Sequence, residues 1–169
     1  MKIIQFQNRQ ELIDGLQSKK RSIIAIDGDA GTGKTNLSCY IGCKLIKNVI
    51  NLDDFLIPKQ DCFVGALLID RLKQRINILK NPIIEGVCVL EVLEKLGIID
   101  YVLIYCKEIS ENIGNWSSAY RLDIDDEADC QKQIQQHHGL DIEIIRYHYK
   151  YRPFEKANYI YQIVNQLKA

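Results

Sequence analysis

The chain alternates between short, continuously apolar runs and longer segments in which apolar residues recur at helical spacing. Residues 22–27 (SIIAID) are apolar at nearly every position, which is typical of a strand buried on both faces of a parallel sheet. Similar runs elsewhere predict further strands at residues 48–52, 83–86, 101–106 and 158–164.

Between these runs, apolar residues lie three or four positions apart, as they do on one face of an α-helix. Leu37, Ile41 and Leu45 show this spacing directly after a glycine-rich turn. Pro82 and Pro153 each stop such a segment, and Gly97 has the position of a helix C-cap. Helices are predicted at residues 11–17, 34–47, 64–80, 88–96, 127–136 and 141–151.

Strands and helices that alternate along a chain imply a parallel sheet covered by helices on both faces. The sequence therefore predicts a three-layer α/β fold with a mostly parallel sheet of about five strands. No repeat and no linker divides the chain, so residues 1–169 are expected to form a single domain. The polar stretch 107–126 contains Gly114 and two adjacent serines, and we expect it to be mobile.

The composition is that of an ordinary globular protein. Of 169 residues, 47% are hydrophobic and 26% are charged, which excludes wholesale disorder and collagen-like repeats. The formal net charge is +0, so nothing indicates nucleic acid or an anionic membrane as a partner. No apolar run approaches the ~20 residues that cross a bilayer. The first ten residues lack a secretion signal, and the six cysteines read as reduced and mostly buried, so we expect a cytoplasmic protein.

The strongest chemical signal is a turn that fits the pattern G-x-x-x-x-G-K-[ST]. Glycines let the backbone direct N–H groups at phosphate oxygens, the lysine reaches the β and γ phosphates, and the hydroxyl ligates Mg²⁺. A buried strand precedes the turn and an amphipathic helix follows it, which is the context that the motif requires. The predicted nucleotide-binding residues are Gly28, Asp29, Ala30, Gly31, Thr32, Gly33, Lys34 and Thr35.

Acidic residues follow three of the predicted strands, at Asp27, at Asp53 with Asp54, and at Glu85. Ligands of open parallel sheets bind outside the carboxyl ends of the strands, so these side chains are expected near the phosphates. Asp27 is interpreted as a structural residue, and Asp54 as a turn residue. Asp29 is expected to point outward, because a carboxylate aimed at the phosphates would oppose their binding.

Two chemical roles are open to a carboxylate beside a phosphate loop. It can hold Mg²⁺, directly or through water, or it can orient an attacking hydroxyl. Asp53 is best placed to face the γ-phosphate and is the predicted catalytic carboxylate, with Lys34 as the catalytic cation. Thr35, Glu85 and Asp53 are the predicted magnesium ligands, in the first or second shell.

These segments resemble the uridine kinase and phosphoribulokinase family of P-loop kinases, which also includes pantothenate and glycerate kinases. The resemblance runs from about residue 22 to residue 164 and implies a P-loop NTPase fold with ATP and Mg²⁺ as ligands. It also implies that Asp53 faces the acceptor hydroxyl and that Glu85 lies on the metal side. The matching segments are IIAIDGDAGTGKT, VINLDDFLIPK, PIIEGVCVLEVLEKLG, DYVLIYC and PFEKANYI.

The chain departs from this family in two places. The insertion between the second and third strands is shortened to one helix, and the lid expected at residues 107–126 has few arginines. Arg71, Arg121 and Arg152 are the candidates for positive charge at the lid or the acceptor.

The function expected from these observations is transfer of the γ-phosphate of ATP to a hydroxyl of a small nucleoside- or sugar-like molecule. A nucleoside monophosphate kinase is an alternative, with Arg71 and Arg75 as the cations that would receive the acceptor phosphate. A non-catalytic ATP-binding module is another. A guanine-nucleotide switch is disfavoured because no N-K-x-D motif follows any predicted strand.

Overall fold

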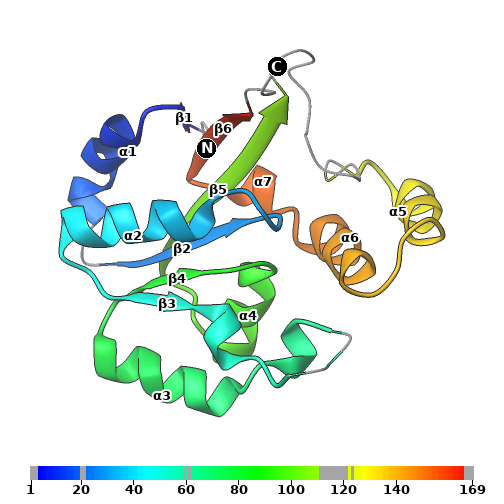
Figure 1. The fold of residues 1–169 in the computed structure, drawn as a ribbon, viewed down its shortest axis with the longest axis horizontal. Coiled ribbons are helices and arrows are strands. Elements are labelled where there is room, and N and C mark those ends of the chain that lie inside the picture. Colours follow the sequence, from blue (N-terminus) through cyan, green and yellow to red (C-terminus); the bar gives the residue numbers. More distant parts are fainter. Residues whose placement is uncertain are drawn as a thin grey trace.

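The computed structural model describes residues 4–19, 22–58, 60, 62–110, 122 and 124–165 (Figure 1). These residues form an α/β fold around one all-parallel sheet of six strands, in the order β1-β6-β5-β2-β4-β3. The strands are β1 (Ile4–Phe6), β2 (Ile23–Gly28), β3 (Val49–Asn51), β4 (Ile83–Glu85), β5 (Tyr101–Ser110) and β6 (Tyr159–Asn165).

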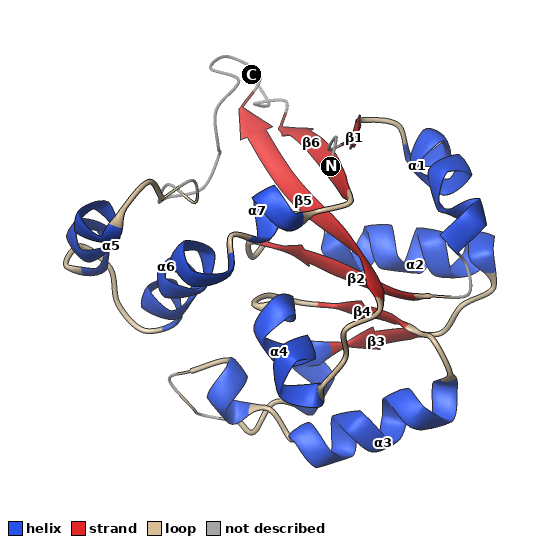
Figure 2. Cartoon of the chain, turned by 180° about the vertical axis from the view of Figure 1, so that it is seen from behind, coloured by secondary structure: helices blue, strands red, loops and turns tan. Residues whose placement is uncertain are grey.

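Helices cover both faces of the sheet. On one face α1 and α2 pack against the apolar side chains of the strands, and α3, α4 and α6 pack on the other (Figures 1 and 2). No described helix is long and apolar enough to cross a membrane. The helices are α1 (Arg9–Leu16), α2 (Lys34–Leu45), α3 (Ile69–Leu79), α4 (Val89–Leu96), α5 (Glu127–Ile134), α6 (Leu140–Tyr151) and α7 (Pro153–Lys156).

The direction in which the chain crosses the sheet decides which face each helix covers. The steps from β1 to β2 and from β2 to β3 lead toward the β3 edge, through α1 and α2. The steps from β3 to β4, β5 and β6 lead back toward the β1 edge, and their helices lie on the other face. This is the arrangement that right-handed crossovers produce. The chain therefore leaves β2 on one face while it leaves both neighbouring strands, β4 and β5, on the other, and such a divergence opens a ligand crevice at the carboxyl ends of strands.

Side chains along β2 alternate between the two faces, as they must in a strand. Ile24 and Ile26 pack with α1 and α2, whereas Ile23 and Ala25 pack with the helices of the opposite face. Asp27 lies on the same face as Ile23 and Ala25, and its carboxylate contacts α6. Consecutive side chains at the end of β2 therefore point to opposite faces of the sheet.

The five predicted strands are all present, but the structure differs from the sequence prediction in three respects. Neither the β1 strand nor the short helix α7 was predicted. The predicted helix 64–80 begins only at Ile69, because residues 64–66 form a 3₁₀ turn and Leu67 forms an antiparallel bridge with Leu56. The backbone N–H of Leu68 donates to the carbonyl of Phe55 at 2.9 Å, which holds this segment outside any helix.

The third difference concerns the segment 107–126. Its first four residues are not a loop: they extend β5, with Lys107 opposite Gln162 and Ile109 opposite Val164 of β6. Residues 111–121 and 123 lie outside the described part of the chain, so the predicted mobility of this segment stays a prediction. All six cysteines are free, but only Cys88, Cys106 and Cys130 are buried, so the expectation that most lie in the core is wrong.

Candidate functional site

The glycine-rich turn between β2 and α2 lies at the carboxyl end of the central strand. Gly28 has a φ of +149°, and a Cβ there would stand 2.6 Å from the carbonyl oxygen of Cys106 in β5. Both the backbone conformation and the close approach of β5 therefore require glycine at this position. Gly33, with a φ of +71°, forms the N-cap of α2 and provides no capping side chain. The first N–H groups of α2 consequently lack side-chain acceptors and face the turn with the positive end of the helix dipole.

Lys34 is the only cationic side chain in this turn. Its ammonium donates to the carbonyl oxygen of Asp29 at 2.5 Å and lies 3.5 Å from the hydroxyl of Thr32. The Lys34 residue is 8% exposed, so the charge is held inside the loop by neutral oxygens. Asp29 is also buried, at 9% exposure, and its carboxylate accepts the N–H of Ala30 at 2.7 Å. The expectation that Asp29 points outward is therefore wrong.

A hydroxyl and a carboxylate lie together beside this loop. The Thr35 hydroxyl donates to Glu85 Oε1 at 3.0 Å, and Glu85 is only 2% exposed. Burial raises the pKa of Glu85; the Thr35 hydrogen bond and the Lys34 charge oppose the increase, and the charges of Asp53 and Asp54 add to it. Thr35, Lys34, Asp53 and Asp54 are therefore all within electrostatic reach of Glu85.

Asp53 and Asp54 do not lie in a strand. β3 ends at Asn51, and the 3₁₀ turn Leu52–Phe55 follows, with the Asn51 side chain accepting the Asp53 N–H at 2.9 Å. Both aspartates are exposed, whereas Leu52 and Phe55 anchor the turn in the core. Side chains in a 3₁₀ turn step by about 120° rather than 180°. The two carboxylates therefore do not face opposite sides in the way that a strand would require.

A cleft of about 370 Å³ lies next to this turn. Asp54 lines it together with Arg71 and Arg75, which lie one turn apart on α3, and Asp53 does not line it. Arg152 is elsewhere, between α6 and α7, where it pairs with Glu155 at 2.9 Å. Three arginines were predicted to serve the lid or the acceptor. Only Arg71 lies beside the 3₁₀ turn Leu52–Phe55, called the aspartate turn below, and Arg121 is outside the described residues.

The structure reveals a buried contact behind the loop that sequence reasoning missed. Asp27 is fully buried; its Oδ1 accepts the Gly28 N–H at 2.8 Å, and its Oδ2 accepts the hydroxyl of Tyr147 in α6. The Tyr147 hydroxyl in turn accepts the N–H of Leu90 at 3.1 Å. Burial raises the pKa of Asp27 to about 6, although Tyr147, the Gly28 N–H and the Lys34 charge favour the ionised form. Asp27 and Tyr147 are 120 positions apart in the sequence, so no local sequence pattern predicts their contact.

The next residue of α6 makes a second buried polar contact. His148 Nδ1–H donates to the carbonyl of Ile144 at 2.8 Å, and Nε2 lies 2.7 Å from the hydroxyl of Tyr105 in β5. The carbonyl can only accept, so Nδ1 carries a proton, and in the neutral ring Nε2 accepts the hydroxyl proton of Tyr105. Burial lowers the pKa of His148 to about 4, which is consistent with this assignment.

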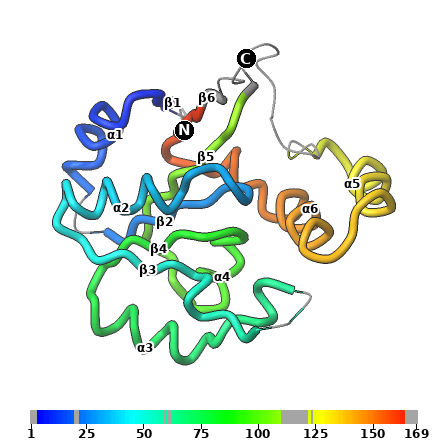
Figure 3. The backbone as a smooth tube through the Cα atoms, in the orientation of Figure 1, coloured from blue at the N-terminus to red at the C-terminus, as the bar shows by residue number. Residues whose placement is uncertain are grey.

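The first half of α6 is attached to the segment that follows the turn Leu52–Phe55. The Glu143 carboxylate accepts the N–H of Phe63 at 2.5 Å and that of Val64 at 2.9 Å, in the segment that follows the aspartate turn. Figure 3 shows α6 beside the turn that joins β2 to α2, with α5 packed along it. One helix therefore bonds both the phosphate-loop strand and the segment that leads into α3.

Comparisons with known proteins leave the family open. No family model and no curated protein matches the chain. Among solved structures, an uncharacterized protein from Eubacterium ventriosum ATCC 27560 is similar with a TM-score of 0.38 and 12% identity, over 85% of this chain and 89% of that chain. Similarity at this level identifies no activity, so the function has to be argued from the site.

Proposed function

We propose that this chain is a P-loop small-molecule kinase of the uridine kinase and phosphoribulokinase type, which transfers the γ-phosphate of ATP to a hydroxyl. The observation that supports this most directly is the arrangement of Lys34, Thr35 and Glu85. The ammonium and the hydroxyl of the first two residues of α2 meet the carboxylate of Glu85 in β4 at the uncapped start of α2, at the carboxyl end of the central strand. Strand, glycine-rich turn and helix follow one another as phosphate binding requires.

The residues present fit a magnesium-bound triphosphate. Mg²⁺ is usually held by one or two protein oxygens together with phosphate oxygens and water, not by a cage of protein ligands. Thr35 and Glu85 supply such oxygens, the charge of Asp53 acts on Glu85, and the described residues contain no group of three or more His, Cys, Asp or Glu side chains that could hold a metal ion. Bound there, Mg²⁺ would neutralise charge on the β- and γ-phosphate oxygens.

The chain's own residues would then position the reactants. The loop N–H groups and Lys34 hold the phosphates, so Lys34 must exchange its bond with the Asp29 carbonyl for phosphate oxygen. Asp53 orients the acceptor hydroxyl and takes its proton as the new phosphate ester bond forms and the bond to the leaving diphosphate breaks. The exposure of Asp53 lets an acceptor from solvent reach it and lets the proton pass on to water.

A second candidate, a nucleoside monophosphate kinase, is favoured by the cleft beside the aspartate turn. Arg71 and Arg75 both line it, and the described residues provide no ion-pair partner for either guanidinium. Two arginines one turn apart can bind an acceptor phosphate through several hydrogen bonds. A hydroxyl acceptor that carries an anionic group would use the same residues.

Calorimetric titration with ATP and Mg²⁺ tests the nucleotide site. Lys34→Ala should lower the affinity about 10- to 100-fold, because it removes a charged hydrogen bond worth about 1.5–3 kcal/mol. Lys44→Ala, an exposed change on the same helix, should bind like the wild type. Equal affinity in all three proteins would contradict the proposal. Turnover with panels of hydroxyl and phosphate acceptors, measured against ATP hydrolysis alone, then separates the two kinase classes from a binding module.

A further inference from the structure

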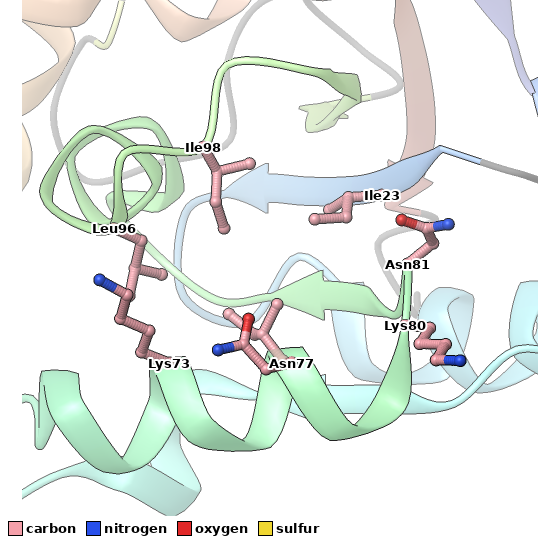
Figure 4. A pocket seen from close by; sticks show the side chains of 8 residues that line it. Ile23, Lys73, Asn77, Lys80, Asn81, Leu96 and Ile98 are labelled. Carbon is pink, nitrogen blue, oxygen red and sulfur yellow. The ribbon is translucent and has the colours of Figure 1, made fainter.

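A separate cavity of about 400 Å³ lies at the opposite end of the sheet from the phosphate loop. It is bounded by the start of β2, the last turns of α3 and the end of α4 (Figure 4). Ile23 begins β2 and Gly28 ends it, and a strand of six residues is roughly 20 Å long. A ligand in this cavity could not touch the loop, so the cavity does not belong to the proposed kinase site.

The inner surface of the cavity is aliphatic. Ile23, Ile76 and Leu96 form it with Ile98, and the first three keep 7–9% exposure through the opening. Ligand pockets of 300–1,000 Å³ with apolar linings are the usual sites for small molecules. This lining favours a ligand with an aliphatic chain or a ring.

The rim supplies hydrogen-bond donors and positive charge. Lys73, Asn77 and Asn81 follow one another at intervals of four, and Figure 4 shows Lys73 and Asn77 extending from α3 toward the Leu96 and Ile98 side. Within the described residues, none of these three side chains has a hydrogen-bond or ion-pair partner. The described residues that line the cavity include no carboxylate, so its charge complements an anion.

The backbone at the end of α3 is strained where it meets the cavity. Lys80 and Asn81 have φ values of +48° and +54°, and neither is glycine. Such residues carry a steric cost and persist where the surrounding structure holds them, often at ligand sites. The turn leaves Asn81 beside Ile23, while the Lys80 ammonium points away from the other lining side chains (Figure 4).

We propose that this cavity binds a small carboxylic acid with an apolar body. The carboxylate would lie at the Lys73 ammonium with the amides of Asn77 and Asn81, and the apolar part would cover Ile23, Ile76 and Leu96. One inward ammonium and two amides match a single negative charge, whereas a phosphate group is better matched by several cations or an arginine fork. This inference does not depend on the kinase proposal.

Octanoate is a suitable probe, compared with 1-octanol and octylammonium by calorimetry and by the melting temperature. Octanoate should bind saturably and raise the melting temperature with concentration, whereas octanol should bind roughly tenfold more weakly and octylammonium more weakly still. Lys73→Gln should weaken octanoate binding by about tenfold, and Asn77→Asp should abolish it by placing a carboxylate at the rim. Both positions are exposed, so the fold should be retained.

Two controls make the result decisive. Lys132→Gln, an exposed change on α5, should leave octanoate binding unchanged. Lys34→Ala should also leave it unchanged, which separates this cavity from the phosphate loop whatever becomes of the kinase proposal. The inference is overturned if octanoate does not bind saturably, if Lys73→Gln and Lys132→Gln bind it equally, or if octanol binds as tightly as octanoate.

Discussion

Asp27 and His148 are buried titratable residues whose pKa values shift in opposite directions. Burial raises the pKa of Asp27 from 3.8 to about 6, so folding favours its protonated form; the stability this provides is present below pH 3.8 and is lost as the pH rises to about 6. Burial lowers the pKa of His148 from 6.5 to about 4, so the stability from neutral His148 is present above pH 6.5 and is lost as the pH falls to about 4. The two contributions oppose each other between about pH 4 and pH 6.

Removing the Asp27 titration with Asp27→Asn should therefore leave the pH dependence of stability that is due to His148. We expect the free energy of unfolding of this variant to rise between pH 4 and pH 6.5 by up to about 3 kcal/mol more than that of the wild type. Urea unfolding at pH 4.5, 6 and 8 measures this. Asp70→Asn, an exposed change on α3, should keep the wild-type profile. Parallel profiles for Asp27→Asn and the wild type would show that Asp27 does not titrate in this range.

Asp53 and Asp54 provide the residue-scale test of phosphotransfer. If Asp53 orients the attacking hydroxyl, Asp53→Asn should lower transfer by roughly 10²- to 10⁴-fold and keep ATP binding, because the loop and Lys34 are untouched. Asp54→Asn should do far less to the chemical step. Steady-state turnover with an accepted hydroxyl substrate measures both. If Asp54→Asn is the inactive variant, the other carboxylate of the turn faces the acceptor; if both variants turn over normally, hydroxyl activation by this turn is wrong.

At the scale of elements, α6 connects parts of the site that are distant in sequence. Tyr147 bonds Asp27 at the end of β2 and the backbone of Leu90 in α4, while Glu143 bonds the backbone of Phe63 and Val64. These contacts lie on one side of the helix, about one turn apart. The position of the segment after the aspartate turn therefore depends on a helix that follows the predicted lid.

Glu143→Gln should loosen that segment without unfolding the protein. A hydrogen bond to a charged acceptor is worth about 1.5–3 kcal/mol, so the amide protons of Phe63 and Val64 should exchange with solvent about 10- to 100-fold faster. Hydrogen exchange followed by NMR measures this, with Glu127→Gln on the exposed start of α5 as the control. Unchanged exchange at Phe63 and Val64 would mean that other contacts hold the segment.

The elements that the sequence predicts well are those whose pattern matches their final surroundings. β2 and β4 are apolar at successive positions because both faces of the sheet are covered, and the glycine turn is visible because backbone conformation requires its glycines. The start of α3 was mispredicted because Val64 and Leu67 have helical spacing but are buried through a 3₁₀ turn and a bridge. The strand β1 was missed because its three residues become a strand only by pairing with β6.

In the candidate site, too, sequence predicts only what does not depend on how distant elements pack. Lys34, Thr35 and Glu85 could be brought together from sequence because the carboxyl ends of parallel strands share one edge. The Tyr147 contact could not, since it depends on how α6 packs on the sheet. Strand alternation cannot decide which of Asp53 and Asp54 faces the phosphate loop, because β3 ends at Asn51 and both aspartates lie in the 3₁₀ turn that follows.

At the scale of the whole molecule, β2 is the strand on which both proposed sites depend. Its carboxyl end leads into the phosphate loop, and its first residue lines the cavity at the amino edge. It pairs along its whole length with β5 and through Ile24, Ala25 and Ile26 with β4, and all six of its residues are buried. The chain can therefore vary the surfaces at either end while this strand stays fixed in the core.

The pairing of β1 with β6 has a consequence for how the chain folds. Ile4 lies opposite Tyr159, so forming this edge closes a loop of nearly the whole chain, and contacts of such long range slow folding to roughly milliseconds to seconds. During refolding, pulsed hydrogen exchange should show β2 and β5 protected first and the amides shared by β1 and β6 last. In the native state, β1 should also detach at lower free energy than the rest of the sheet, because only three residues hold it. Protection of β1 as early as β2 would mean that the edge strand helps to nucleate the fold instead of completing it.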